Sequence, residues 1–184
     1  ESYNISVEAL HRAITPRTKA IMPVHLLGNP CRMDAIMLTA QEHRLSVIED
    51  ACEAHGAEFL GRKVGSFGNL STFSFFFSHH ISTIEGGMVL TNSLLDADDT
   101  RARRAHGWIR EMTSRGFVSN EYPSIDSRFL FLHLGYNFRP TEIAGAFGIH
   151  QLPRLEGLVE IRREAAKYIT DSLARYQDWI QLPY

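Results

Sequence analysis

FSFFFSHHISTIEGGMVLTN, residues 73–92, joins two apolar runs through a polar loop. The first run, Phe73–Phe77, is aromatic and stops at Ser78, and the second, Met88–Leu90, follows two glycines. This pattern predicts a buried strand, a loop at its end and a further strand. The loop carries His79 and His80, and imidazole is the side chain whose unperturbed proton equilibrium lies nearest neutral pH. The pair is a candidate for proton transfer; the alternative is two loop histidines bound to backbone carbonyls.

The composition predicts one sizeable core. The chain has 184 residues, of which 44% are hydrophobic and 22% charged, so a single α/β domain is expected. The formal charge of −2 does not indicate binding to nucleic acid or to an anionic membrane. The basic cluster of Arg101, Arg103 and Arg104 also fits a solvated helix face. No apolar run reaches membrane length, and Cys31 and Cys52 are the only cysteines. These features favour a reducing, cytoplasmic setting.

The first third of the chain has the order of a parallel sheet. Ala20–Leu26 has the composition of a buried strand, and Met33–His43 carries apolar residues at helical spacing. A second strand, Ser46–Ile48, follows and ends in Glu49 and Asp50. Strand, helix and strand in this order form the unit of a parallel sheet.

The remaining elements are predicted from turn residues and helical spacing. Gly61–Gly65 predicts a hairpin turn between short strands. Leu94–His106 is charged and predicted to be helical. Pro140 is expected at the first position of a helix that Pro153 breaks, and a second amphipathic helix is expected from Arg154 onward.

The segment between these helices, Gly107–Tyr136, is predicted to be a long connection. It carries Trp108 and Arg110 near its start. Long loops inside a compact domain are more often functional than idle. We therefore interpret it as a substrate-side or subunit-contact loop, with a plain surface connection as the alternative.

Three of the predicted strands end in chemically useful side chains. In an open parallel sheet, ligands bind outside the carboxyl ends of the strands, so His25, Asp50 and the segment Ser74–His79 can approach one site. An acid that faces a pyridine nitrogen keeps it protonated, which makes the ring an electron sink. The alternative for Asp50 is that it caps the turn after its strand.

Four segments resemble a known family. VIEDACEAHGA (47–57), VGSFGNLSTFSFF (64–76), HHISTIEGGMVLTN (79–92) and GYNFRPTEIAGAFGIHQLPRL (135–155) are similar to the DegT/DnrJ/StrS family of nucleotide-sugar aminotransferases and dehydratases, which use pyridoxal phosphate (PLP). The resemblance implies the aspartate-aminotransferase-like, type I PLP fold. It implies that residues 1–152 form part of the large domain, without its amino-terminal portion, and that residues 153–184 lead to a small carboxy-terminal domain.

The resemblance also implies roles for single residues. Asp50 would pair with the pyridine nitrogen, and Ser74 would bind the cofactor phosphate. Asn137 would reach the phosphate of the neighbouring subunit's cofactor, because sites in this family lie at a homodimer interface. Glu53 stands where many relatives have Gln near the ring hydroxyl, and an acid there would repel a phenolate.

The main departure from the aminotransferases is at His79. Aminotransferases of this family carry their Schiff-base lysine there, and an imidazole has no primary amine to condense with an aldehyde. Lys19, Lys63 and Lys167 are the only lysines, and none is an obvious replacement. PLP or pyridoxamine phosphate (PMP) would therefore be held without a covalent bond.

A histidine at this position is similar to the 3-dehydratase branch of the family. That likeness implies that PMP condenses with the C4 ketone of a nucleotide-linked 4-keto-6-deoxy sugar and that His79 acts as base on the cofactor's C4′ proton. Expulsion of the C3 hydroxyl then gives a 3-deoxy sugar, as in deoxysugar and polysaccharide biosynthesis. His80 has a supporting role, and Trp108 and Arg110 are candidates for substrate binding.

Three alternatives remain. The chain belongs to an aminotransferase with a relocated lysine, or to a non-catalytic homologue that keeps the dimer for binding or regulation, or it binds a metal through His79, His80 and Glu85. The metal site is disfavoured because zinc usually takes three or four ligands with supporting partners. By itself this chain is expected to bind PLP weakly or not at all, and to expose apolar surface where further strands would pair.

Overall fold

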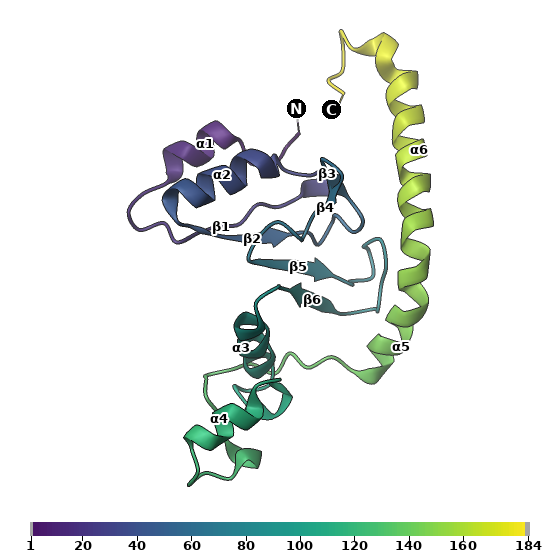
Figure 1. The fold of residues 1–184 in the computed structure, drawn as a ribbon. Coiled ribbons are helices and arrows are strands. Elements are labelled where there is room, and N and C mark those ends of the chain that lie inside the picture. The colour runs from purple at the N-terminus through teal and green to yellow at the C-terminus, as the bar shows by residue number, and fades with distance from the viewer. Residues whose placement is uncertain (1, 183–184) are drawn as a thin grey trace.

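The computed structural model describes residues 2–182 and has an α/β architecture around a four-stranded sheet (Figure 1). The strands are β1 (Ala20–Ile21), β2 (Ser46–Asp50), β5 (Leu70–Ser74) and β6 (Gly87–Leu90), in the order β1-β2-β5-β6. The first three are parallel, and β6 is antiparallel to β5. The predicted class, a mostly parallel sheet with flanking helices, is confirmed.

Two helices cover one face of the sheet and form the main core with it. These are α1 (Val7–Ala13) and α2 (Met33–His43), which lie together beside β1 and β2 in Figure 1. Met33 and Ile36 of α2 are fully buried against Val47 of β2. The bounds of α2 are those that the apolar spacing predicts, because Met33, Ile36 and Ala40 at that spacing face this core.

The other elements extend away from this core. They are β3 (Glu58–Phe59), β4 (Arg62–Lys63), α3 (Leu94–Arg104), α4 (Arg115–Glu121), α5 (Glu142–Gln151) and α6 (Leu155–Leu173), with 3-10 helices at Leu26–Gly28, Ile109–Glu111, Ser127–Phe129, Leu152–Arg154 and Ala174–Tyr176. In Figure 1, α3 and α4 lie below the sheet, and α6 runs along its side. The predicted break at Pro153 is confirmed, since a 3-10 turn separates α5 from α6.

The strand predicted over Phe73–Phe77 is shorter than expected. It ends at Ser74, and its partner β6 begins at the paired residue, Gly87. After Ser74 the chain turns into the loop. The N–H of Phe75 donates to the carbonyl oxygen of Gly86, and the N–H of Thr83 donates to the carbonyl oxygen of Phe75. Phe77 is 69% exposed, so aromatic content alone overestimated the strand.

Four further boundaries differ from the predictions. The hairpin turn lies at Leu60 and Gly61, which both have positive φ, rather than over Gly61–Gly65. The first strand spans two residues, after which only Val24 bridges to β2. The connection 107–136 contains α4 and two 3-10 helices. Pro140 lies before α5 rather than in it, because the Thr141 side chain caps the helix.

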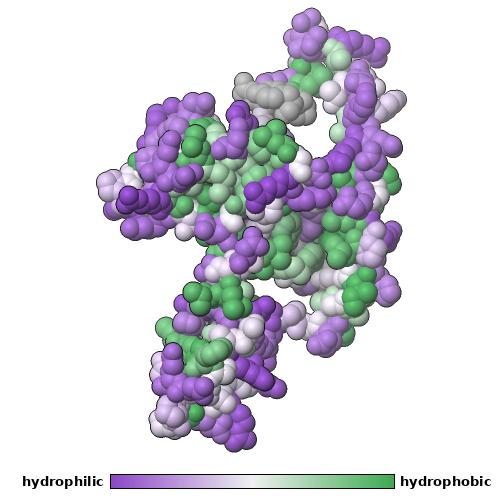
Figure 2. Space-filling view, viewed as in Figure 1, coloured by the Kyte–Doolittle hydropathy of each residue, from purple (hydrophilic) through white to green (hydrophobic). Residues whose placement is uncertain are grey.

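Apolar side chains are exposed on the outer strand and on the long helix. All four residues of the outer strand β6 are exposed, and in α6 only Val159 is buried. The apolar face predicted for that helix is therefore only partly covered, since Ile161 and Ile169 are 63% and 54% exposed. Figure 2 shows hydrophobic residues at the surface over the sheet and beside the long helix.

Gly107 supports a testable prediction about the segment after α3. Its φ is +85°, and a Cβ there would lie 1.7 Å from the carbonyl oxygen of His133. Gly107→Ala should therefore lower the free energy of unfolding by more than about 2 kcal/mol. The control is Gly157→Ala in α6, where a Cβ meets nothing within 4 Å and should stabilise by about 0.5–1 kcal/mol. Equal urea midpoints for the two variants would contradict this.

Candidate active site

The carboxyl ends of β2 and β5 present polar side chains on one face of the sheet. The register pairs Asp50 with Thr72, and Ser74 follows two residues later on the same strand. Paired residues, and residues two apart in a strand, face the same side of a sheet. Asp50, Thr72 and Ser74 therefore share one face. Their neighbours Glu49 and Phe73 point to the other face.

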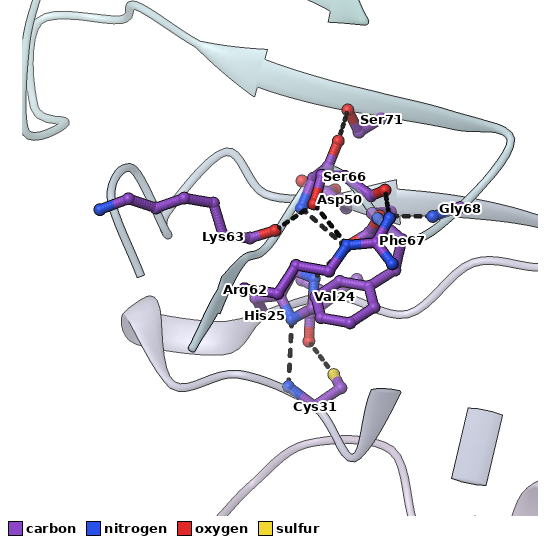
Figure 3. A network of polar contacts seen from close by, with 12 residues as sticks. Val24, His25, Cys31, Asp50, Arg62, Lys63, Ser66, Phe67, Gly68 and Ser71 are labelled. Carbon is purple, nitrogen blue, oxygen red and sulfur yellow. Dashed lines mark hydrogen bonds and ion pairs between the residues drawn. The ribbon is translucent and has the colours of Figure 1, made fainter. Parts of the chain in front are cut away.

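Glu49 is fully buried on that other face and organises the loop before β5. Its carboxylate accepts hydrogen bonds from the backbone N–H groups of Gly65, Phe67 and Gly68, each at 2.7 Å, and contacts His25 Nε2 at 3.2 Å. Figure 3 shows His25 and this loop converging on the end of β2. The sequence interpretation missed Glu49, because only the folded chain brings these donors together.

The protonation of the buried pair follows from its neighbours. The N–H of Cys31 donates to His25 Nδ1 at 3.0 Å, so the ring proton is on Nε2 and is donated to Glu49 (Figure 3). Burial raises the pKa of Glu49, but the bonds from His25 and the backbone outweigh it and hold the pKa below its usual value. His25 is therefore part of the core. It does not lie with Asp50 and Ser74, so its predicted place in their site is wrong.

Asp50 and Ser74 each keep capacity for a ligand. Asp50 Oδ1 accepts the N–H of Cys52 at 3.1 Å, which is the turn-capping role considered above, while its other oxygen has no partner within residues 2–182. Ser74 Oγ accepts the N–H of Phe76 at 3.3 Å and still has its own proton to donate. A carboxylate and a hydroxyl on one face fit a protonated pyridine nitrogen and a phosphate group.

The other two residues assigned to the cofactor have hydrogen-bond partners of their own. Glu53 accepts the N–H of Leu27 at 2.7 Å and so holds the loop after β1. Asn137 is exposed, and its backbone bridges Ala105 at the end of α3. Its side chain accepts a bond from Arg139 at 2.9 Å. The structure does not bring Asn137 to Asp50 in this chain.

The two histidines after β5 have different surroundings. His79 is half-buried, and its ring lies 6.1 Å from that of Phe76. The ring of His80 lies 5.6 Å from that of His55, which is only 5% exposed and also packs on Phe73. Within residues 2–182 no hydrogen bond joins the His79 ring to Asp50 or Ser74. Sequence reasoning overlooked His55, although it lies five residues after Asp50 in a quoted motif.

Burial keeps two of these imidazoles neutral. Burial, together with repulsion from the neighbouring His80 and His79, lowers the pKa of His55 to about 4. Burial also lowers the pKa of His80, with added repulsion from Arg162 and His79. At neutral pH these rings are therefore hydrogen-bonding groups rather than cations.

The two residues predicted for substrate binding lie together. The Arg110 guanidinium is 5.1 Å from the centre of the Trp108 ring, and that ring stacks on Phe131 at 5.8 Å. The segment is anchored by Asp98 of α3, which is 2% exposed and accepts bonds from Ser114 at 2.6 and 2.9 Å. Burial raises the pKa of Asp98, but these bonds outweigh burial and hold the pKa far below its usual value.

The lysines lie outside this site. Lys19 is exposed before β1, Lys63 pairs with Glu58 at 2.9 Å, and Lys167 pairs with Asp171 at 2.6 Å. The part of the chain that the structure describes holds no group of three or more His, Cys, Asp or Glu residues placed to bind a metal ion. None of the helices described there combines the length and apolar composition needed to cross a bilayer.

Comparison with known proteins identifies the family of this chain. The DegT/DnrJ/EryC1/StrS aminotransferase family matches residues 1–183. The chain belongs to this family. A GDP-4-keto-6-deoxy-D-mannose 3-dehydratase of Yersinia pseudotuberculosis is 42% identical over 169 residues, covering 90% of this chain and 43% of the relative. A GDP-perosamine synthase of Caulobacter vibrioides is 40% identical over 183 residues, covering 100% and 45%.

Solved structures confirm the fold. An aminotransferase from Psychrobacter cryohalolentis matches with a TM-score of 0.88 at 34% identity, covering 100% of this chain and 46% of that one. A GDP-4-keto-6-deoxymannose-3-dehydratase variant with bound GDP-perosamine matches with a TM-score of 0.86 at 38% identity, covering 95% and 46%. The chain thus spans less than half the length of these relatives.

The buried Glu49 gives a stability prediction. Glu49→Gln removes the charge that three backbone donors and His25 face, and an amide NH2 cannot accept their bonds. The free energy of unfolding should fall by about 3 kcal/mol in urea titrations. Glu42→Gln, on the exposed surface of α2, is the matched control and should change stability by less than about 0.5 kcal/mol. A loss below about 1 kcal/mol in the Glu49 variant would show that the network contributes little.

The lowered pKa of His55 predicts a pH dependence. The unfolded chain takes up a proton near the ordinary value of 6.5, whereas the folded ring resists it until pH falls to about 4. The contribution of His55 is therefore intact above pH 6.5 and declines across this window, by about 3 kcal/mol at most. His55→Gln should flatten the pH profile of unfolding there, and His43→Gln, on the surface of α2, should not. Parallel profiles for His55→Gln and the unmodified protein would refute this.

Proposed function

We propose that this chain carries the proton-transfer residues of a PLP/PMP-dependent enzyme that removes the C3 hydroxyl of a nucleotide-linked 4-keto-6-deoxy sugar. One observation carries the proposal: an imidazole, at His79, stands where aminotransferases of the family have their Schiff-base lysine. The placement of Lys63 and Lys167 in surface ion pairs supports it. The complete protein would therefore hold its cofactor non-covalently.

The cofactor, when bound, supplies a pyridine ring that accepts electrons. Asp50 would keep the ring nitrogen protonated through its free oxygen, and Ser74 would donate its hydroxyl to the phosphate. His79 would remove and return the proton at the carbon next to the ring, and the neutral His80 would support it. Positioned acid–base catalysis of this kind contributes about 10²- to 10⁴-fold.

An aminotransferase of the same family is the second candidate. It is favoured by the GDP-perosamine synthase of Caulobacter vibrioides, which at 40% identity is nearly as similar as the 3-dehydratase at 42%. Such an enzyme would need a primary amine near Asp50. A cofactor signal that survives dialysis and is lost with borohydride reduction would support this candidate and exclude the first.

The partner proposed for the site is a second copy of the protein. Asn137 is exposed, and its backbone bridges Ala105, the residue after α3, outside the face that Asp50 and Ser74 share. In a homodimer with shared sites it would reach the phosphate in the neighbouring subunit, and Trp108 and Arg110 would contact the nucleotide sugar. On this view the 184-residue chain alone binds PLP weakly or not at all. A tight, stoichiometric cofactor in it would contradict the proposal.

The decisive test is His79→Asn in the complete protein. The variant should lose at least about 100-fold in formation of the 3-deoxy product from GDP- or dTDP-linked 4-keto-6-deoxy sugars, because proton removal fails. Its affinity for PMP, followed by absorbance titration, should stay within about threefold of the unmodified protein. His106→Asn, at an exposed position, is the control. Loss of PMP binding together with activity would mean that His79 acts in folding or binding, and full activity would exclude it as the base.

A further inference from the structure

One buried imidazole near the candidate active site has no partner for its polar atoms. His55 is 5% exposed, and neither of its ring nitrogens has a hydrogen-bond partner within residues 2–182. Its ring packs on Phe73 at 5.4 Å and on Phe75 at 5.7 Å, and these phenyl rings offer no nitrogen or oxygen atom. A buried polar group without a partner costs about 1–3 kcal/mol, so native structures rarely leave one unexplained.

The ring of His80 has a matching buried atom. Its Nδ1 is enclosed without a partner among the described residues, and its ring centre lies 5.6 Å from that of His55, with 45° between the ring planes. Two imidazoles joined by an N–H···N hydrogen bond have ring centres about 5 Å apart, since the two nitrogens are then about 3 Å apart. The observed separation is close to this value. Because the χ2 torsion of histidine is broad, rotation of the rings can aim the two nitrogens at each other.

The pair connects the loop of His79 to the packed side of the sheet. His80 is the next residue after His79, so the orientation of the His80 ring constrains the backbone at both positions. His55 packs on Phe73, which points to the face opposite its neighbour Ser74. His80 therefore reaches from the loop toward a buried partner on the side of the sheet away from Ser74.

We propose that His55 is a positioning residue and forms an N–H···N hydrogen bond with Nδ1 of His80 in the complete protein. This role rests on the proposed function, in which His79 moves the proton. Burial lowers the pKa of both rings, so both are neutral at neutral pH. A neutral imidazole has one donor and one acceptor nitrogen, so the bond would set the tautomer of both rings. It would also hold the loop so that the His79 ring keeps one position.

The hydrogen bond is tested by NMR in the complete protein, before and after PMP is added. Isotope labelling of histidine nitrogens reports which ring nitrogen carries the proton. A ring proton between His55 and His80 Nδ1 is expected, with slow exchange with water and a nitrogen–nitrogen coupling across the bond. His55→Phe should remove this signal, and His43→Phe, on the exposed surface of α2, should not. Rapid exchange of both ring protons, without coupling between the rings, would overturn the proposal.

The consequence for catalysis is tested with the same variants. His55→Phe keeps an aromatic ring against Phe73, so it separates the loss of the nitrogens from the loss of packing. Its kcat should fall about tenfold, because small displacements of a catalytic group are costly, while KM stays within about twofold. The double variant His55→Phe with His80→Phe should be no slower than His80→Phe alone, since His55 acts through His80. Additive losses, or an unchanged kcat in His55→Phe, would overturn the positioning role.

Failure of this role and failure of the proposed function give different results. Full activity of His79→Asn would exclude His79 as the base, whereas the hydrogen bond between His55 and His80 would still be measured by NMR. An inactive His79→Asn variant beside a fully active His55→Phe variant would overturn the role of His55 alone.

Discussion

The buried carboxylate of Glu49 is the interaction on which the rest of this structure depends. It sits in the central strand β2 and gathers the N–H groups of Gly65, Phe67 and Gly68 with the imidazole of His25. These contacts fix the loop that leads into β5, and hence the position of Ser74. The next residue along β2 is Asp50, so the same strand holds the scaffold on one face and presents a free carboxylate oxygen on the other.

A comparable arrangement fixes the segment that carries Asn137. The N–H of His106 donates to the carbonyl oxygen of Tyr136 at 2.7 Å, and the N–H of Tyr136 donates to that of Arg103 at 2.6 Å. Gly107 allows the two backbones to approach closely. Asp98 anchors the same α3 to the loop after Trp108. The residues proposed to face the substrate and the neighbouring subunit are therefore attached to one helix. That helix continues directly from β6.

Local signals in the sequence located most elements, and failures arose where long-range contacts decide the outcome. The spacing of Met33–His43 fixed α2 because its apolar face and its core coincide. The aromatic run after Ser74 looked like a longer strand, but its antiparallel partner β6 begins only at Gly87, the residue paired with Ser74. Asp50 and Ser74 were predicted as cofactor ligands from strand ends and family motifs, and the register places them on one face of the sheet. His25 was placed in the site and lies in the core, since nothing local reveals that Glu49 and Cys31 bind it.

The alternation of Glu49 and Asp50 also restricts how the sheet can pair. A slip of β2 by one residue would turn every side chain to the opposite face. It would move the carboxylate of Glu49 away from its three backbone donors and set Asp50 among apolar side chains, where an unpaired charge is strongly unfavourable. The register of parallel strands shifts easily when both faces are uniformly apolar. Here two adjacent acids define a single alignment, so shifted registers of β2 are unfavourable.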